Sequence, residues 1–144
     1  MTNEEIEVGN RLIAEFMGYK LVTPDMRSNP SEWKLSYWEN PEFKGSSKGV
    51  LCSEKGLSYH CSWNWLMKVV EKIESLKDTH HGYFGVHISS NSCSIQGTNL
   101  WMALKDSSYG YVYMSDPNAI FSTKLESTWY NVVKFIKWYN DNIQ

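Results

Sequence analysis

Hydrophobic positions near the start of the chain recur with the spacing of an α-helix. Thr2 and Glu5 have the spacing of a capping box, in which each side chain bonds the backbone N–H of the other residue. The apolar residues of this segment share one helical face: Ile6, Ile13, Phe16 and Met17. Gly18 follows where a left-handed C-cap belongs. The pattern predicts a helix that ends at Gly18.

A second helical pattern runs from Tyr59 to Leu76. With Trp63 placed at zero, its apolar side chains cover an arc of about 200° on the helix. The residues near the middle of that arc are Leu66, Val70 and Ile73. Trp65 lies at the edge of the arc, next to Cys61. An arc this wide predicts contact with both a sheet and a neighbouring helix.

The last helical pattern begins with another capping box, Thr123 and Glu126, and runs to the C-terminus. One stripe holds its apolar residues: Leu125, Trp129, Val132, Val133, Ile136, Tyr139 and Ile143. Tyr130 and Trp138 fall outside this stripe. Trp138 lies about 140° from the centre of the stripe, so we expect its ring to be mostly in water in a monomer.

Strand patterns separate the second and last helices. Residues 83–89 alternate between apolar and polar or small side chains, and Ser90 with Asn91 offers a turn into a second strand, which predicts a hairpin. Residues 100–104 are apolar on both faces, as in a strand that is covered on both sides. We therefore predict an α+β fold in a single domain, residues 1–144, with an antiparallel sheet sandwiched between helices in three α/β/α layers.

The segment from Lys20 to Ser58 has a different character, because prolines and glycines interrupt it throughout. Only residues 33–38, WKLSYW, have the pattern of a strand. Two interpretations stay open: a functional or mobile loop, or a surface excursion pinned by Trp33 and Trp38.

Composition narrows the classes of partner. The net charge is −2 and the Lys and Arg residues are dispersed, which makes nucleic acid an unlikely partner. No apolar run is long enough to span a bilayer, so we expect no membrane partner. Three cysteines, an odd number without CxxC spacing, argue against a disulfide framework and a zinc site and favour a cytoplasmic location.

Two patterns suggest chemistry. Cys61 follows His60 at a helix start, where a thiol can become reactive. Consecutive helical residues nevertheless point about 100° apart. A Cys–His dyad would therefore need a non-helical start or a distant histidine such as His81 or His87. The adjacent pair His80 and His81 lacks the spacing of metal ligands on a helix. We expect a structural Cys61, no catalytic residue that the sequence can name, no metal and no cofactor.

Aromatic residues make up 15% of the chain, with seven Trp and nine Tyr. Such rings serve as anchors at interfaces and pocket rims, although single exposed aromatics are also normal and only a contiguous cluster would count. The binding candidates lie off the main apolar stripe of their element or at its edge: Trp38, Trp65, Cys61, Tyr130 and Trp138.

Three blocks stand together in this chain: NRLIAEFMGYK, YHCSWNWLMKVVEKIE and TKLESTWYNVVKFIKWYN. Together they resemble the small phage and prophage proteins grouped as the phage ABA-sandwich family. The resemblance covers the helices well and the segment from Lys20 to Ser58 poorly. It implies an α/β/α sandwich and an origin in a mobile element, and it implies no activity.

These observations favour an uncharacterised phage or prophage accessory protein that binds a host protein or a small ligand without catalysis. A small hydrolase or transferase using Cys61 or a His/Asp pair is the first alternative. The second is a structural, self-associating subunit, a homodimer in which Tyr130 and Trp138 are buried between copies.

Overall fold

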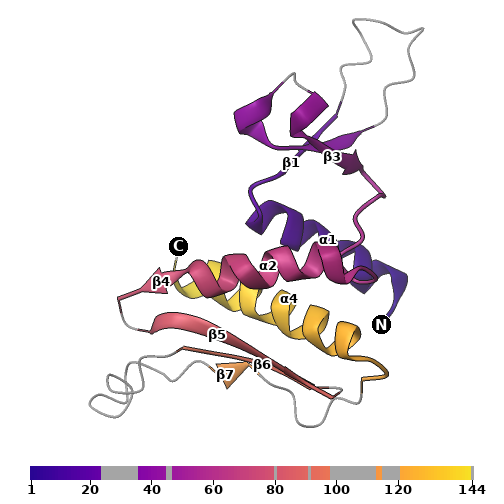
Figure 1. Ribbon diagram of the computed structural model, residues 1–144. Helices are drawn as coiled ribbons and strands as arrows, with labels where there is room; N and C mark the ends of the chain where they lie inside the picture. Colours follow the sequence, from indigo (N-terminus) through magenta and orange to yellow (C-terminus); the bar gives the residue numbers. More distant parts are fainter. Residues whose placement is uncertain are drawn as a thin grey trace, which may run out of the picture. The chain divides into compact units, whose positions relative to one another are not determined.

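The chain divides into two compact units, Met1–Ser58 and Tyr59–Gln144, and each is described by itself. The computed structural model describes residues 1–23, 36–44, 47–79, 81–90, 92–97, 113–114 and 121–143. The element labels in Figure 1 follow chain order, with α1 and β1–β3 in the first unit and the remaining labels in the second.

Helix α1, Asn3–Phe16, begins and ends as its sequence predicts. Thr2 accepts a hydrogen bond from the Glu5 N–H, and the Glu5 carboxylate accepts one from the Thr2 N–H. At the other end Gly18 adopts φ +92°, and the N–H groups of Gly18 and Tyr19 donate to the carbonyls of Glu15 and Ala14. This bonding is the Schellman motif, which satisfies carbonyls that the helix itself leaves without partners.

The first unit contains a three-stranded antiparallel sheet, ordered β1-β2-β3, where only one strand was predicted. Its strands are β1 Lys20–Val22, β2 Tyr37–Glu39 and β3 Val50–Ser53. Two short 3-10 helices, η1 Pro41–Phe43 and η2 Ser47–Gly49, lie between β2 and β3 in the chain. Strands of three or four residues are too short to show an alternating pattern, so the sequence does not reveal β1 or β3. The start of WKLSYW, residues 33–35, lies outside the described residues.

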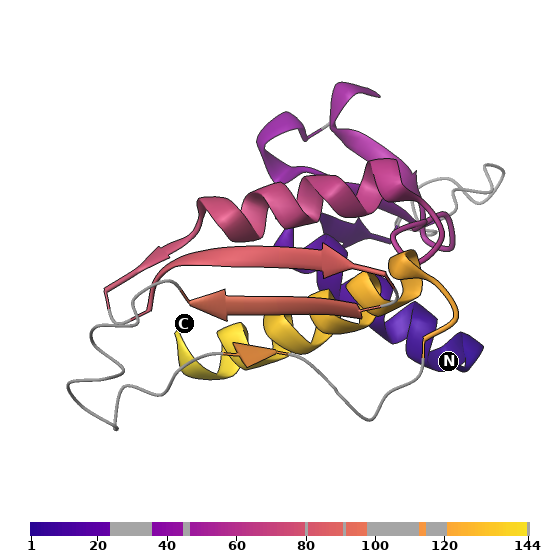
Figure 2. The ribbon, with the colours of Figure 1, turned by 60° about the horizontal axis from the view of Figure 1, so that its bottom comes forward.

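The second unit is built on a four-stranded antiparallel sheet ordered β4-β5-β6-β7 (Figure 2). The strands are β4 Lys77–Asp78, β5 Gly82–Ser89, β6 Ser92–Gly97 and β7 Tyr113–Met114. The predicted hairpin is confirmed: β5 pairs with β6 from Phe84↔Gly97 to Ser89↔Ser92. The strand predicted over residues 100–104 lies outside the described residues.

Helices α2, Trp63–Ser75, and α4, Lys124–Asn142, lie along the same face of this sheet (Figure 1). Burial alternates along the hairpin, so one face of the sheet supplies side chains to the core and the other does not. The core residues from the sheet are Phe84, Cys93 and Ile95. Those from α2 are Leu66, Val69, Val70 and Ile73, as the arc of its apolar residues predicts.

Helix α4 is buried over a wider arc than its apolar stripe indicates. Ser127, Thr128 and Asn131 are buried along with Phe135, which the stripe also leaves out. Thr128 Oγ1 and Asn131 Nδ2 donate to carbonyls four residues earlier, at 2.7 and 2.9 Å, which lets these side chains leave water while their donors stay bonded. The predicted apolar stripe does not include this side of the helix, because three of these four residues are polar.

The predicted α+β class, with antiparallel strands packed against helices, is confirmed. A second antiparallel sheet, in the first unit, was not predicted. Among the described residues, no helix combines the length and the apolar character needed to cross a membrane.

Candidate functional site

The residues before α2 are not helical, which changes the geometry expected for Cys61. Ser62 is the N-cap, with extended φ and ψ, and residues 59–61 form a turn. The 100° separation expected for helical residues does not apply to His60 and Cys61 in a turn, so the non-helical start that a dyad would need is present. Cys61 is exposed, and each of these two residues has an interaction partner in the structure.

An exposed apolar surface follows Cys61 along α2. Trp63 and Met67 are four residues apart, on one side of the helix, and have exposed fractions of 37% and 38%. Trp65 lies on the opposite side of the helix, where its half-buried ring meets the buried ring of Tyr59 edge-on at 5.1 Å between centroids. The helical pattern placed Trp63 inside the apolar arc and did not indicate that Trp63 and Met67 reach the surface.

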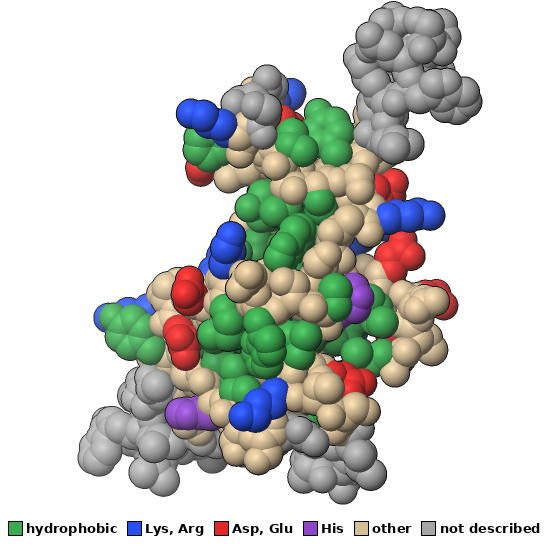
Figure 3. All heavy atoms as spheres, turned by 45° about the vertical axis from the view of Figure 1, so that its right-hand side comes forward, with side chains coloured by type: hydrophobic (Ala, Val, Ile, Leu, Met, Phe, Trp, Pro, Cys, Tyr) green, Lys and Arg blue, Asp and Glu red, His purple; other side chains and the backbone are tan. Residues whose placement is uncertain are grey.

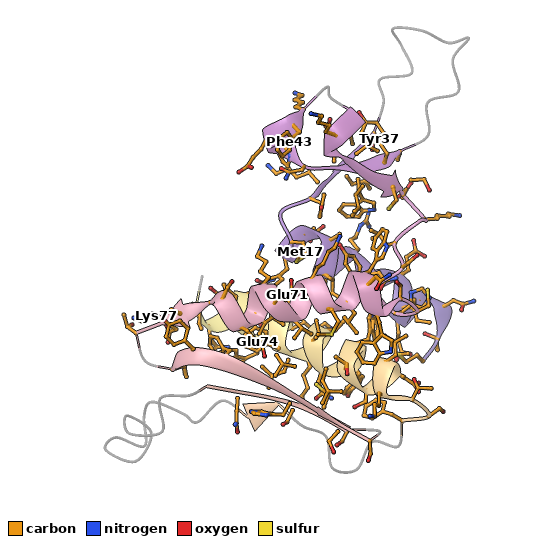
Figure 4. All side chains as sticks on the ribbon, in the orientation of Figure 1. Met17, Tyr37, Phe43, Glu71, Glu74 and Lys77 are labelled. Atoms are coloured by element: carbon orange, nitrogen blue, oxygen red, sulfur yellow. The ribbon has the colours of Figure 1, made fainter. Side chains whose placement is uncertain are left out.

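The side of α2 that carries Trp63 and Met67 continues to the edge of the sheet. Glu74 lies about two helical turns beyond Met67 on this side of α2. Its Oε1 accepts a hydrogen bond from the backbone N–H of Val86 in β5, at 3.3 Å. Figure 4 labels Glu71 and Glu74 on α2 and Lys77 after its C-terminal end. A helix carboxylate here occupies the position where a neighbouring strand would place a carbonyl.

A second cluster lies where β4 turns into β5. Asp78 Oδ2 lies 2.6 Å from His81 Nδ1 and also accepts the His81 backbone N–H at 2.9 Å. The two side chains are only 14% and 16% exposed. Because one carboxylate oxygen bonds both the ring and the backbone of His81, it holds the imidazole in one orientation.

Aromatic rings surround the other sides of His81. Its ring stacks on Phe84 at 6.1 Å and meets Trp138 edge-on at 5.3 Å, and Phe135 contacts both Phe84 and Trp138. Trp138 is therefore half-buried inside its own unit, and the expectation that it is mostly in water was wrong. The buried polar residues of α4 extend the covered arc as far as this ring.

Close packing at Gly97 adds to this cluster. A Cβ placed on Gly97 would lie 3.0 Å from the His81 carbonyl oxygen and 3.1 Å from the His81 Cβ. The absence of a side chain at this position of β6 lets the Asp78–His81 turn approach the sheet closely. The sequence analysis left the His/Asp pair without residue numbers, and it gave no sign that Asp78 pairs with His81 or that Gly97 accommodates them.

The remaining aromatic candidates lie apart from these clusters. Trp38, in β2 of the first unit, is 1% exposed, and its indole N–H donates to the Glu54 carbonyl at 3.3 Å. A ring buried and bonded in this way offers no surface to a partner. Tyr130 on α4 is half-buried, and its ring lies 5.1 Å from that of Phe121.

All three cysteines are free thiols in different environments. Burial raises the pKa of the Cys93 thiol to about 11, although its hydrogen bond with Thr128 acts in the opposite direction. Burial also raises the pKa of Cys52. Neither thiol has the lowered pKa that activates a cysteine nucleophile. Within the described residues, no three His, Cys, Asp or Glu side chains come together as metal ligands would.

Comparison with protein-family models, with curated proteins and with solved structures finds no match to this chain.

Proposed function

We propose that this protein is a cytoplasmic phage or prophage accessory protein that binds a host protein or a small ligand without catalysis. The resemblance of its three helical blocks to the phage ABA-sandwich family supports the mobile-element origin. An odd number of cysteines, each a free thiol, supports a reducing compartment.

The observation that carries the binding proposal is the exposed apolar side of α2. Trp63 and Met67 lie next to each other on the helix surface, and Val86 and Ile88 at the adjoining edge of β5 are only partly covered. Figure 3 shows hydrophobic side chains gathered at the height of α2 and β5. Neighbouring exposed apolar residues of this kind mark interaction surfaces more often than scattered single ones do.

Copurification from the native host, followed by mass spectrometry of bound proteins and small molecules, tests this proposal. Met67→Glu should lower the recovery of the bound molecule about tenfold, because it places a charge on the apolar surface. Lys68→Glu changes an exposed neighbour on another side of the helix and is the matched control. A molecule recovered equally with both variants would contradict this surface, and recovery of no molecule would contradict the function.

The pairing of Asp78 with His81 favours a second candidate, a small hydrolase or transferase. A histidine oriented by a carboxylate is the usual form of a general base. Assays with p-nitrophenyl esters and phosphates test it, with His81→Gln as the variant that should abolish any turnover. Turnover unchanged in His81→Gln would exclude this pair, and Cys61→Ala then tests the remaining nucleophile.

A further inference from the structure

The outer edge of β5 has backbone groups that point away from its hairpin partner. Val86 donates its N–H to Glu74, so this group is turned away from β6. Backbone orientation repeats every two residues along an antiparallel strand, so Ile88 turns its N–H and C=O the same way. Together with the Val86 carbonyl, these groups form a short row of donors and acceptors on one side of the strand.

Strand β4 covers only the beginning of this edge. Its register with β5 consists of Lys77↔Tyr83 and Asp78↔Gly82. Beyond Tyr83, no other strand in the described part of the chain pairs with this side of β5. Glu74 bonds Val86, and no strand of the described ranges pairs with the edge from Val86 to Ser89, so a further strand can bond it.

Helix α2 lies along this edge in both ribbon views (Figures 1 and 2). Its exposed Trp63 and Met67 lie on the same side of the helix as Glu74, whose side chain reaches β5. A strand added to β5 would therefore have α2 beside it, and alternate side chains of that strand would meet this apolar surface.

We propose that the edge of β5 from Val86 to Ser89 binds an extended peptide segment of a partner protein as an additional strand. The peptide has alternating apolar residues that contact Trp63 and Met67, and a Lys or Arg that pairs with Glu74 or the exposed Glu71. A peptide carbonyl takes over the Val86 N–H, which releases the Glu74 carboxylate to bind the cation. This inference rests on the proposed binding function and names its surface and its partner class.

Charge and backbone pattern select this occupant. A helix satisfies its own backbone groups and cannot bond the row on β5, whereas an extended peptide presents N–H and C=O groups at the same spacing. A second copy of the chain would bring the same carboxylates and a net charge of −2. A basic, extended peptide matches both features.

The test begins with a random ten-residue peptide library selected against the full-length protein. Enriched peptides are synthesised with a fluorophore, and their Kd values are measured by fluorescence anisotropy. Ile88→Pro removes one outward N–H and should weaken binding about tenfold or more, since proline cannot donate to an added strand. Ile88→Val keeps the N–H and is the matched control. Glu74→Lys should weaken basic peptides several-fold in low salt.

A second measurement leaves the protein unchanged. Peptides N-methylated at one position at a time should lose binding at every second residue, because alternate N–H groups face β5. This scan decides the question if circular dichroism shows that Ile88→Pro does not fold.

Several results would overturn the edge as the binding site. The first is that the selection enriches no peptide. The second is that the effect of N-methylation does not alternate from one peptide residue to the next. The third is that a folded Ile88→Pro protein binds the peptides with the same Kd as the parent protein. Light scattering that shows a dimer abolished by Ile88→Pro would replace the peptide by a second copy. Binding lost in Met67→Glu and kept in Ile88→Pro would preserve the proposed function and reject only the strand edge.

Discussion

At the scale of single residues, the three thiols differ only in their surroundings. Cys61 is exposed, Cys52 is partly covered and Cys93 is 2% exposed with a pKa raised to about 11. With iodoacetamide at neutral pH, we expect Cys61 to react at the rate of a model thiol, Cys52 more slowly, and Cys93 only after unfolding. Peptide mass spectrometry after timed labelling measures the three rates. Cys61 labelling far faster than a model thiol would instead support a catalytic cysteine.

Trp138 is a second test at this scale, because its ring contacts His81, Phe84 and Phe135. Trp138→Glu should lower the free energy of unfolding by about 1 to 3 kcal/mol, since it replaces a half-buried ring by a carboxylate. The exposed neighbour Lys137 provides the control Lys137→Glu, which should stay within about 0.5 kcal/mol. Urea unfolding gives both values.

The same variant also tests the predicted homodimer. A Trp138→Glu protein of unchanged stability but lower apparent mass in light scattering would mean that the ring is buried between copies. Equal apparent masses for the variant and the parent protein would remove Trp138 from any two-fold contact.

At the scale of elements, α2 separates core from surface. Val70, near the middle of the apolar arc, is 3% exposed, whereas Trp65, at the edge of the arc, is half-buried. Val70→Asp should prevent folding, because an aspartate in the core costs several kcal/mol, a large share of a domain's stability. Trp65→Ala should cost about 1 to 3 kcal/mol and still melt cooperatively. Thermal melts followed by circular dichroism measure both, and a folded Val70→Asp would contradict the orientation of α2.

The end of α1 offers a test of backbone geometry alone. Gly18 has φ +92°, and a Cβ built there meets no atom within 4 Å. Gly18→Ala should therefore cost about 1 kcal/mol through backbone strain, without any clash. Gly18→Asn should cost less, because Asn adopts positive φ more readily. Chemical unfolding compares the two, and a larger loss for Asn than for Ala would show that side-chain contacts matter here.

At the scale of the whole molecule, the free energy of unfolding should fall at alkaline pH because the Cys93 thiol ionises more readily in the unfolded chain than in the folded one. Its folded-state pKa is raised to about 11, so the unfolded chain loses this proton at lower pH than the folded chain does. The contribution is complete below the ordinary thiol pKa near 8.5 and is lost as pH rises from there to about 11, about 3 kcal/mol in all.

Urea unfolding between pH 8 and 10.5 measures this effect. Cys93→Ala should flatten the decline in stability relative to the parent protein, whereas the exposed Cys61→Ala should leave it unchanged. Parallel declines for the parent and Cys93→Ala would show that other groups cause the alkaline loss.

Local signals in the sequence were sufficient for features that depend on neighbours in the chain. The capping box at Thr2, the N-cap at Thr123, the C-cap at Gly18 and the hairpin turn after Ser89 all involve residues within five positions of each other. At Thr123 the predicted capping box is only half formed, because the Glu126 carboxylate accepts from the Ser122 N–H instead of the Thr123 N–H. The apolar arc of α2 likewise predicted its buried residues. The α+β class followed from these elements.

Tertiary structure alone decided which polar and aromatic side chains lie inside. Asn131 and Ser127 lie outside the predicted apolar stripe of α4, yet both are buried, and Trp138 on the same helix lies against His81. The approach of His81 to Gly97 and of Glu74 to Val86 joins residues more than ten positions apart. A periodic pattern records which residues are apolar, whereas burial depends on what the rest of the chain places over them, and that is known only when the elements have packed.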